Sequence, residues 1–244
     1  MYFPICLWVL PILGFGQVPS NSISTFSIVA HDPKTGELGV AVQSKLVAVG
    51  AVVPFAKAGV GAIATQAWGN PRFGSVGLEL LASGNSTDKV VDLMSEADSN
   101  REHRQFAVLG ANGNSSIFTG KQCMAWAGGK RGRGYAVIGN ILTGPEVIEA
   151  MAKGFENTKG TLAEKMLISL HSGQKAGGDK RGRQSAALLI VNEGWGYGGL
   201  SDRFRDLRVD DHPTPIKELE RIYSIHRRIF PRPDKIKFSS KNDQ

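Results

Sequence analysis

The residue best placed to do chemistry is Thr25, which opens an alternating apolar segment directly behind a stretch that looks like a cleavable leader. If cleavage made Thr25 the first residue of the mature chain, its free α-amine would have a pKa of about 7.7–8.0 and would be partly neutral at neutral pH. That amine could take the hydroxyl proton while Oγ attacks an amide carbonyl. Any residue left in front would convert the amine into an amide, which is not basic. The chemistry therefore requires cleavage directly before Thr25.

The expected leader covers residues 1–24. Residues 2–16, YFPICLWVLPILGFG, are apolar and uncharged, and small polar residues follow, which is the form of a secretory signal. It departs from that form because no Lys or Arg precedes Lys34. Cuts after Gly16 and after Ser24 both suit the small-residue rule, but only the second exposes Thr25. We expect export to the periplasm or the medium if the leader functions, with no membrane anchor after processing, and a cytoplasmic protein otherwise.

The composition of the 244 residues is that of a globular protein, with 41% hydrophobic and 21% charged residues. The formal net charge is +7. The basic residues nevertheless form only small scattered groups without a nucleic-acid-binding motif, so we expect no nucleic-acid partner. Cys6 lies in the leader and Cys123 stands alone, which excludes an internal disulfide in the mature chain. The His spacings match no metal-binding pattern, so we predict neither a metal nor a cofactor.

The order of predicted elements indicates an α+β fold. Two alternating segments joined by the turn DPKTGE predict a hairpin, and runs of strands then alternate with pairs of helices. This is not the βαβ alternation of a doubly wound sheet, so we expect two antiparallel sheets covered by helices. One domain is expected over residues 25–230, followed by a polar tail at 231–244. The predicted strands are residues 25–30, 38–45, 60–67, 104–113, 115–120, 135–140, 184–194 and 202–211, and the predicted helices are 75–82, 87–98, 145–155, 161–171 and 215–229.

Long motifs follow one another along most of the chain: TFSIVAHDPKTGELGVAVQSK, VVPFAKAGVGAIATQAWGNPRFGSVGLELLASG, TGKQCMAWAGG, YAVIGNILTGPEVIEAM, SGQKAGGDKRGRQSAALL and VDDHPTPIKELERI. From Thr25 to Ile229 they resemble the bacterial DUF1028 family, which is placed in the N-terminal nucleophile (Ntn) hydrolase superfamily. The resemblance implies a four-layer αββα sandwich whose first strand opens with the nucleophile. In related sequences without a leader, the corresponding Thr follows the initiator Met, whose removal would expose it.

An N-terminal Thr nucleophile needs a nearby cation that lowers the pKa of its amine and hydroxyl. Lys45, at the end of the second predicted strand, and Lys57, before the third, are the candidates. The resemblance favours Lys57, because superfamily members such as the proteasome subunits place a lysine there. The alternative is that Lys57 is an ordinary surface residue. Ser44 is expected to hydrogen-bond the Thr25 amine from the adjacent strand.

Donors for the oxyanion of the reaction are expected in the segment ATQAWGN. The candidates are the backbone N–H groups of Gln66 and Ala67 and the side chains of Gln66 and Asn70. A glycine-flanked turn of this kind is also common without any catalytic role.

A second polar segment, GGDKRGRQS, enters an apolar strand, where charge is costly unless it is paired. Asp179 and Arg183 could form a structural ion pair, or Arg183 could bind a substrate carboxylate through a bidentate contact. Asn140, at the end of the strand YAVIGN, could make a further polar contact with substrate or occupy a left-handed turn position.

These residues together predict an amidohydrolase of the Ntn type that cleaves an amide or peptide-like bond in a small molecule, with an acyl-enzyme intermediate on Thr25. The alternative from another class is a catalytically silent protein of the same fold that binds a small molecule or peptide in the same cleft. A third hypothesis, polyanion binding by the basic surface, predicts a steep dependence on salt. Because Ntn relatives often assemble, a homo-oligomer is among the expected partners.

Overall fold

The computed structural model describes residues 25–235. These residues form ten strands and five α-helices in an α+β arrangement. The elements are β1 (Thr25–His31), β2 (Leu38–Ser44), β3 (Pro54–Lys57), β4 (Gly61–Ala67), α1 (Arg72–Ala82), α2 (Thr87–Glu96), β5 (Arg104–Gly110), β6 (Ser115–Thr119), β7 (Gly128–Gly132), β8 (Tyr135–Asn140), α3 (Glu146–Asn157), α4 (Leu162–Lys175), β9 (Ser185–Val191), β10 (Arg203–Val209) and α5 (Pro215–Ile229).

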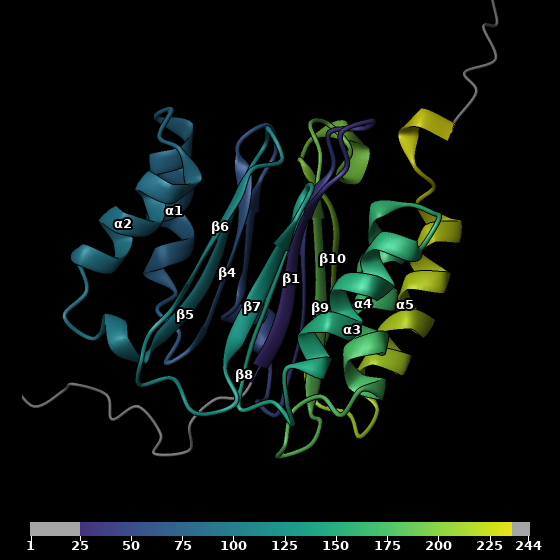
Figure 1. Ribbon diagram of the computed structural model, residues 1–244. Coiled ribbons are helices and arrows are strands. Elements are labelled where there is room, and N and C mark those ends of the chain that lie inside the picture. Colours follow the sequence, from purple (N-terminus) through teal and green to yellow (C-terminus); the bar gives the residue numbers. More distant parts are fainter. Residues whose placement is uncertain (1–24, 236–244) are drawn as a thin grey trace, which may run out of the picture.

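The strands form two antiparallel sheets that pack face to face (Figure 1). Sheet A has six strands in the order β10-β9-β2-β1-β8-β7, and sheet B has four in the order β3-β4-β5-β6. Helices α3, α4 and α5 cover the outer face of sheet A, and α1 and α2 cover the outer face of sheet B. The predicted α+β class with two antiparallel sheets is confirmed. No helix in residues 25–235 is both long enough and apolar enough to span a membrane.

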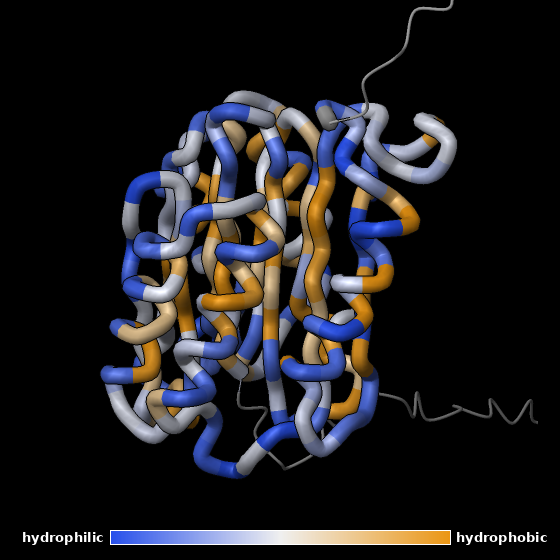
Figure 2. The backbone as a smooth tube through the Cα atoms, turned by 90° about the vertical axis from the view of Figure 1, so that its right-hand side faces the viewer, coloured by the Kyte–Doolittle hydropathy of each residue, from blue (hydrophilic) through white to orange (hydrophobic). Residues whose placement is uncertain are grey.

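Three hydrophobic cores hold the layers together, and the alternation of side chains along β1 shows how. Phe26 and Ile28 pack under the helices of sheet A, whereas Val29 lies in the core between the two sheets. A third core, which includes Phe73 and Phe106, fills the space between sheet B and its helices. Figure 2 shows hydrophobic segments running along the strands, and hydrophilic residues in the turns and along the outer helices. A strand with both faces buried must be apolar on both, so a buried polar residue in a central strand is costly unless it is hydrogen-bonded.

The structure adds two strands that the sequence pattern does not reveal. β3 (Pro54–Lys57) forms a hairpin with β4, and the glycine-rich β7 (Gly128–Gly132) pairs with β8 at the edge of sheet A. Neither segment shows the apolar alternation that predicts a strand. Lys57 is the last residue of β3 and lies just before β4, which is the strand expected at residues 60–67.

The segment expected as a polar tail begins within the folded domain. The Arg232 guanidinium is 3.3 Å from the Glu37 carboxylate, with the two side chains only 11% and 1% exposed. A one-turn helix at Pro233–Lys235 follows. The expected leader (1–24) and the remainder of the tail (236–244) lie outside the described residues.

Candidate functional site

Thr25 is the first residue of β1, one of the central strands of sheet A. It lies directly between Ser44 of β2 and Asn140 of β8 in the strand register. The side chain is fully buried, and its Oγ1 donates a hydrogen bond to the Ser44 Oγ at 3.1 Å. The expected neighbourhood of Thr25 and Ser44 is therefore present, through the two hydroxyls. Because directly paired residues point to the same face, Thr25, Ser44 and Asn140 form a polar row that faces sheet B.

Gln66 fixes Thr25 from the opposite sheet. Its Nε2 donates to the Thr25 carbonyl oxygen at 3.1 Å and to Gln105 Oε1 at 2.8 Å, and its Oε1 accepts from Ser27 Oγ at 2.6 Å. Gln105 in turn donates to the carbonyl oxygen of Gly139 at 2.9 Å. Gly139 belongs to β8, the strand beside Thr25 in sheet A. The Gln66 side chain is thus fully engaged in a buried network between the sheets, and the expectation that it faces a substrate oxyanion needs correction.

The expected role of Asn70 needs the same correction. Its Nδ2 donates to Asp98 at 3.3 Å, and its Oδ1 accepts from the backbone N–H of Arg72 at the start of α1. Arg104 also binds Asp98, at 2.9 Å, and these contacts hold the pKa of the Asp98 carboxyl below its usual value although its partial burial acts in the opposite direction. The Asn70 side chain therefore shapes the entry into α1. Of the expected oxyanion donors, the backbone N–H of Ala67 remains a candidate, because that of Gln66 points to its ladder partner Gln105 in β5.

Strained backbone gathers at this end of the sheets. Within residues 25–235, three residues other than glycine have a left-handed φ: Ala48 (55°), Ala67 (64°) and Ile141 (53°). Ala67 directly follows Gln66, which binds Thr25, and Ile141 directly follows Asn140, the β8 partner of Thr25. Ala48 lies in the loop after β2. This conformation costs an L-residue roughly 1–2 kcal/mol and is rare for a β-branched side chain. Such residues cluster at functional sites. The left-handed position suggested for Asn140 belongs instead to Ile141.

The structure separates Lys57 from Thr25. Lys57 pairs with Gly61 at the start of β4, whereas Gln66, which binds Thr25, is five residues further along that strand. At about 3.3 Å per residue, this places Lys57 roughly 17 Å away along the strand. The proposed role of Lys57 as the cation beside Thr25 therefore needs correction. Lys45, the other candidate, directly follows Ser44 and lies at the correct end of the sheet.

Asp179 is buried and orders the basic loop that ends sheet A. Its carboxylate accepts from the backbone N–H groups of Lys45, at 3.1 Å, and Arg181, at 2.8 Å, and its partner in an ion pair is the Arg181 guanidinium at 3.3 Å. The ion pair suggested between Asp179 and Arg183 is thus formed by Arg181 instead. The sequence spacing allowed either arginine, because both follow a glycine-rich turn.

Arg183 points to a separate cavity of about 370 Å³ between the end of α4 and the start of α5. Lys175, Lys217, His171 and the Gln174 carboxamide also line this cavity, and no Asp or Glu does. Within residues 25–235, no ion pair neutralises Arg183, Lys175 or Lys217, and the acid near the cavity, Glu220, lies 3.7 Å from His171. The cavity is therefore suited to a negatively charged group.

This cavity lies at the same end of sheet A as Thr25. The residue after Arg183, Gln184, donates its backbone N–H to the Ser44 carbonyl oxygen at 3.0 Å. The cavity itself opens on the helix side of sheet A, whereas the Thr25 side chain faces sheet B. The structure thus brings together Thr25, Ser44, Asn140, Gln66, Ala67 and Asp179 at one end of the sheets, with Arg183 beside them.

Sequence reasoning missed Gln105 and Ser27, which complete the buried network, and the strain at Ala48 and Ile141. Polar residues at alternate positions of otherwise apolar central strands, as in TFSIVA and RQFAVLG, were the available indication. Among the described residues, no three His, Cys, Asp or Glu side chains are grouped in a way that could hold a metal ion.

Comparison with known proteins identifies this two-sheet α+β protein at the level of a family. The model of the family described as "Family of unknown function (DUF1028)" matches residues 25–219. A crystal structure of a protein of that family from Silicibacter pomeroyi is similar with a TM-score of 0.77 and 30% identity, over 84% of this chain and 89% of that chain. The chain therefore belongs to the DUF1028 family.

A second solved structure, Anbu (ancestral beta-subunit) from Yersinia bercovieri, is similar at a TM-score of 0.36 and 11% identity, over 82% of this chain and 93% of that chain. No match was found among curated proteins.

Proposed function

We propose that the protein is the precursor of an Ntn-type amidohydrolase whose nucleophile is Thr25, freed by cleavage of the Ser24–Thr25 bond. The observation that carries the proposal is the position of Thr25, which begins a central strand with its hydroxyl 3.1 Å from Ser44 Oγ and its carbonyl held by Gln66. The strained residues around it give further support.

The reaction would proceed in two steps. The free α-amine of Thr25 takes the hydroxyl proton, and Oγ1 attacks the amide carbonyl carbon of the substrate. The C–N bond breaks, the leaving amine takes the proton, and the acyl group remains on Oγ1 as an ester. Water then attacks this ester with the amine again as base, which releases a carboxylic acid and restores Thr25.

The neighbouring residues supply positioning and charge. Ser44 holds the Thr25 hydroxyl, and Gln66 fixes the backbone so that the hydroxyl keeps its direction. Lys45 adds positive charge at this end of the sheet, which favours the deprotonated hydroxyl and the neutral amine. The backbone N–H of Ala67 is the proposed oxyanion donor.

The proposed substrate is a small amide or peptide-like molecule. The cavity of Arg183, Lys175 and Lys217 opens on the opposite face of sheet A, so its positive charge does not bear on the substrate of Thr25. Export through the leader would place the activity outside the cytoplasm, and a homo-oligomer is the proposed assembly.

The test compares three chains. One begins at Thr25, the second carries one additional Gly in front of Thr25, and the third begins at Ala through Thr25→Ala. Amine release from a library of acylated amino acids and short peptides is measured together with the intact mass, which detects the acyl group on Thr25. We expect release and acylation only with the first chain.

Equal release by all three chains would refute the proposal. If none of the three releases amine while the Thr25→Ala chain binds library members as tightly as the first, the catalytically silent binding protein is the better account.

A further inference from the structure

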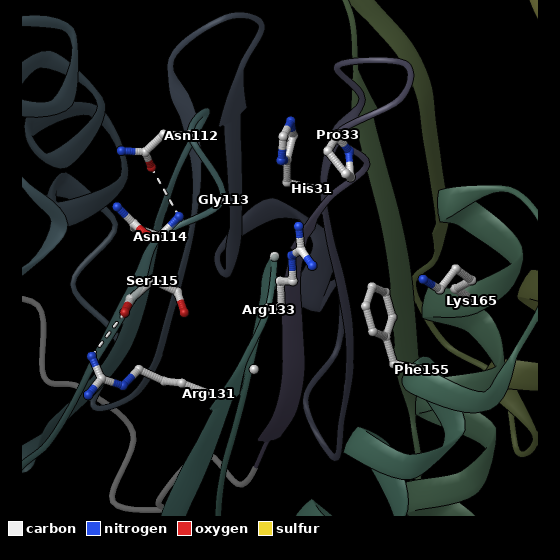
Figure 3. Close-up of a pocket in the computed structure, with 12 residues that line it drawn as sticks. His31, Pro33, Asn112, Gly113, Asn114, Ser115, Arg131, Arg133, Phe155 and Lys165 are labelled. Carbon is white, nitrogen blue, oxygen red and sulfur yellow. Dashed lines mark hydrogen bonds between the residues drawn. The ribbon is translucent and has the colours of Figure 1, made fainter.

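A second cavity lies at the opposite end of the molecule from Thr25. β1 runs from Thr25 to His31, which at about 3.3 Å per residue is roughly 20 Å. Around His31, the turn between β5 and β6, the turn between β7 and β8, and helices α3 and α4 enclose a cavity of about 660 Å³ (Figure 3). Ligand cavities in proteins commonly measure about 300–1,000 Å³.

The charge of this cavity is one-sided. Arg131, Arg133 and Lys165 line it, and no Asp or Glu is among the lining residues. His31 also lines it, and burial lowers the pKa of its imidazole more than Asp32 raises it, which favours the neutral form at neutral pH. The nearby carboxylate of Asp88 is 3.8 Å from Arg131. The cavity therefore presents a net positive surface.

Two of the three cations are held in place by the protein. Arg131 Nη1 donates to the Ser115 carbonyl oxygen at 3.0 Å, and Lys165 Nζ lies 4.2 Å from the centroid of the Phe155 ring. Arg131 shares its charge with the Asp88 carboxylate, whereas within residues 25–235 Lys165 has no carboxylate partner and keeps its full positive charge. Two further acids are near: Asp32 acts on His31, and Glu156 accepts a hydrogen bond from the Tyr135 hydroxyl at 2.5 Å.

Arg133 is the third cation, and within the described part of the chain it has no hydrogen bond or ion pair from its side chain. Figure 3 shows its guanidinium pointing into the space beneath His31 and Pro33, between the asparagines of the β5–β6 turn and Lys165. The tight turn that carries Arg133 is fixed, because Gly134 has φ +74° and its carbonyl oxygen accepts from the His31 N–H at 2.9 Å. The unneutralised guanidinium therefore extends from a well-defined backbone position.

Amide donors complete the wall opposite Lys165. Asn112 Oδ1 accepts from the Asn114 backbone N–H at 3.0 Å, so the carboxamide is oriented and its Nδ2 remains a donor. A ligand in this cavity would meet donors from both sheets and from α4, and no acidic group of the lining would repel it.

We propose that this cavity binds a small organic anion with at least two negatively charged groups, phosphate or carboxylate, that bridge Arg133 and Lys165. Guanidinium groups bind both kinds of anion through paired hydrogen bonds, and an ammonium group adds a point charge. A single-charge anion would leave one of the two cations without a partner. The proposal does not depend on any activity of Thr25, whose site lies at the other end of β1.

The test is isothermal titration calorimetry of the full chain with pyrophosphate and with citrate at constant ionic strength, and with acetate as the single-charge reference. The test variant combines Arg133→Gln with Lys165→Gln. The matched control combines Lys89→Gln with Arg228→Gln, two exposed cations elsewhere that change the net charge by the same amount.

We expect saturable one-site binding of pyrophosphate or citrate, none of acetate, and affinity at least tenfold weaker in the test variant but unchanged in the control. The tighter of the two probes identifies phosphate or carboxylate as the natural group. Circular dichroism of both variants verifies folding. If the test variant does not fold, Arg133→Lys is used in its place, and because it keeps the charge it should retain most of the affinity. The absence of saturable binding to both probes, or equal weakening in the control, would overturn the proposal.

Discussion

Replacement of Gln66 by Met tests whether the buried network between the sheets holds Thr25 in place. Met has nearly the same length as Gln but no strong donor or acceptor. The substitution removes the bonds to the Thr25 carbonyl oxygen and Gln105 Oε1, and the one received from Ser27 Oγ, at a position that is 1% exposed.

The expected cost follows from the three groups that lose a partner. A polar group left buried without a hydrogen bond costs about 1–3 kcal/mol. The Ser27 hydroxyl and the Gln105 carboxamide can partly reorient, so we expect the lower part of the sum, about 3–5 kcal/mol. For a domain of this size the melting temperature should fall by roughly 6–20 °C.

The assay is urea unfolding followed by tryptophan fluorescence, with Gln122→Met, at an exposed position, as the control, for which we expect a change within about 0.5 kcal/mol. Adding Ser27→Ala to Gln66→Met should restore part of the lost stability, because it removes one of the unsatisfied groups. A loss below about 1 kcal/mol for Gln66→Met would refute the network as a structural support. Gln66 would then be free for the oxyanion role expected from the sequence.

Three further predictions concern other parts of the chain. Arg232→Gln should lower the free energy of unfolding by about 3 kcal/mol at pH 7. Burial already raises the pKa of Glu37, and loss of Arg232 raises that pKa further. The loss of unfolding free energy should therefore shrink as the pH falls and Glu37 takes up a proton. Arg228→Gln is the control, and a loss that does not change with pH would contradict this cause. Burial raises the pKa of the Cys123 thiol to about 11, so iodoacetamide at pH 8 should label it much more slowly in the folded chain than in urea, and equal rates would contradict that pKa. Ala67→Gly should raise the free energy of unfolding by about 1 kcal/mol in urea titrations, because glycine adopts a left-handed φ without strain, and a loss of stability would mean that the methyl group packs more favourably than the strain costs.

The sequence predicts the elements with strong periodicity well. The alternation in TFSIVA and LGVAVQS and the turn between them indicate the β1–β2 hairpin, and Thr25 and Ser44 become neighbours through that hairpin alone. The switch between runs of strands and pairs of helices indicates two sheets with helical covers.

Long-range partners and special backbone conformations are outside the reach of such patterns. The pairing of Thr25 with Asn140 depends on β8, more than one hundred residues away in the chain, and strand order is not encoded in local periodicity. The distance of Lys57 from Thr25 is set by which end of β4 lies beside β1, and no local pattern encodes that choice. The left-handed φ at Ile141 is likewise invisible, because a β-branched residue is the least expected type there.

The hydrogen-bond partners of the buried polar side chains could not be predicted from the sequence either. Gln66 and Asn70 are suitable donors by type, but their partners, Gln105 and Asp98, come from β5 and the loop before it. Asp179 could pair with either of two nearby arginines, and the geometry of the loop selects Arg181.

The central claim is that Thr25 becomes the first residue of the mature chain and acts as the nucleophile. Intact-mass measurement and N-terminal sequencing of the protein exported by its native host test this most directly. The account predicts a mature chain that begins at Thr25. A chain that begins at Gln17 or retains Met1 would leave the Thr25 nitrogen in a peptide bond, and the self-activated threonine mechanism would be contradicted.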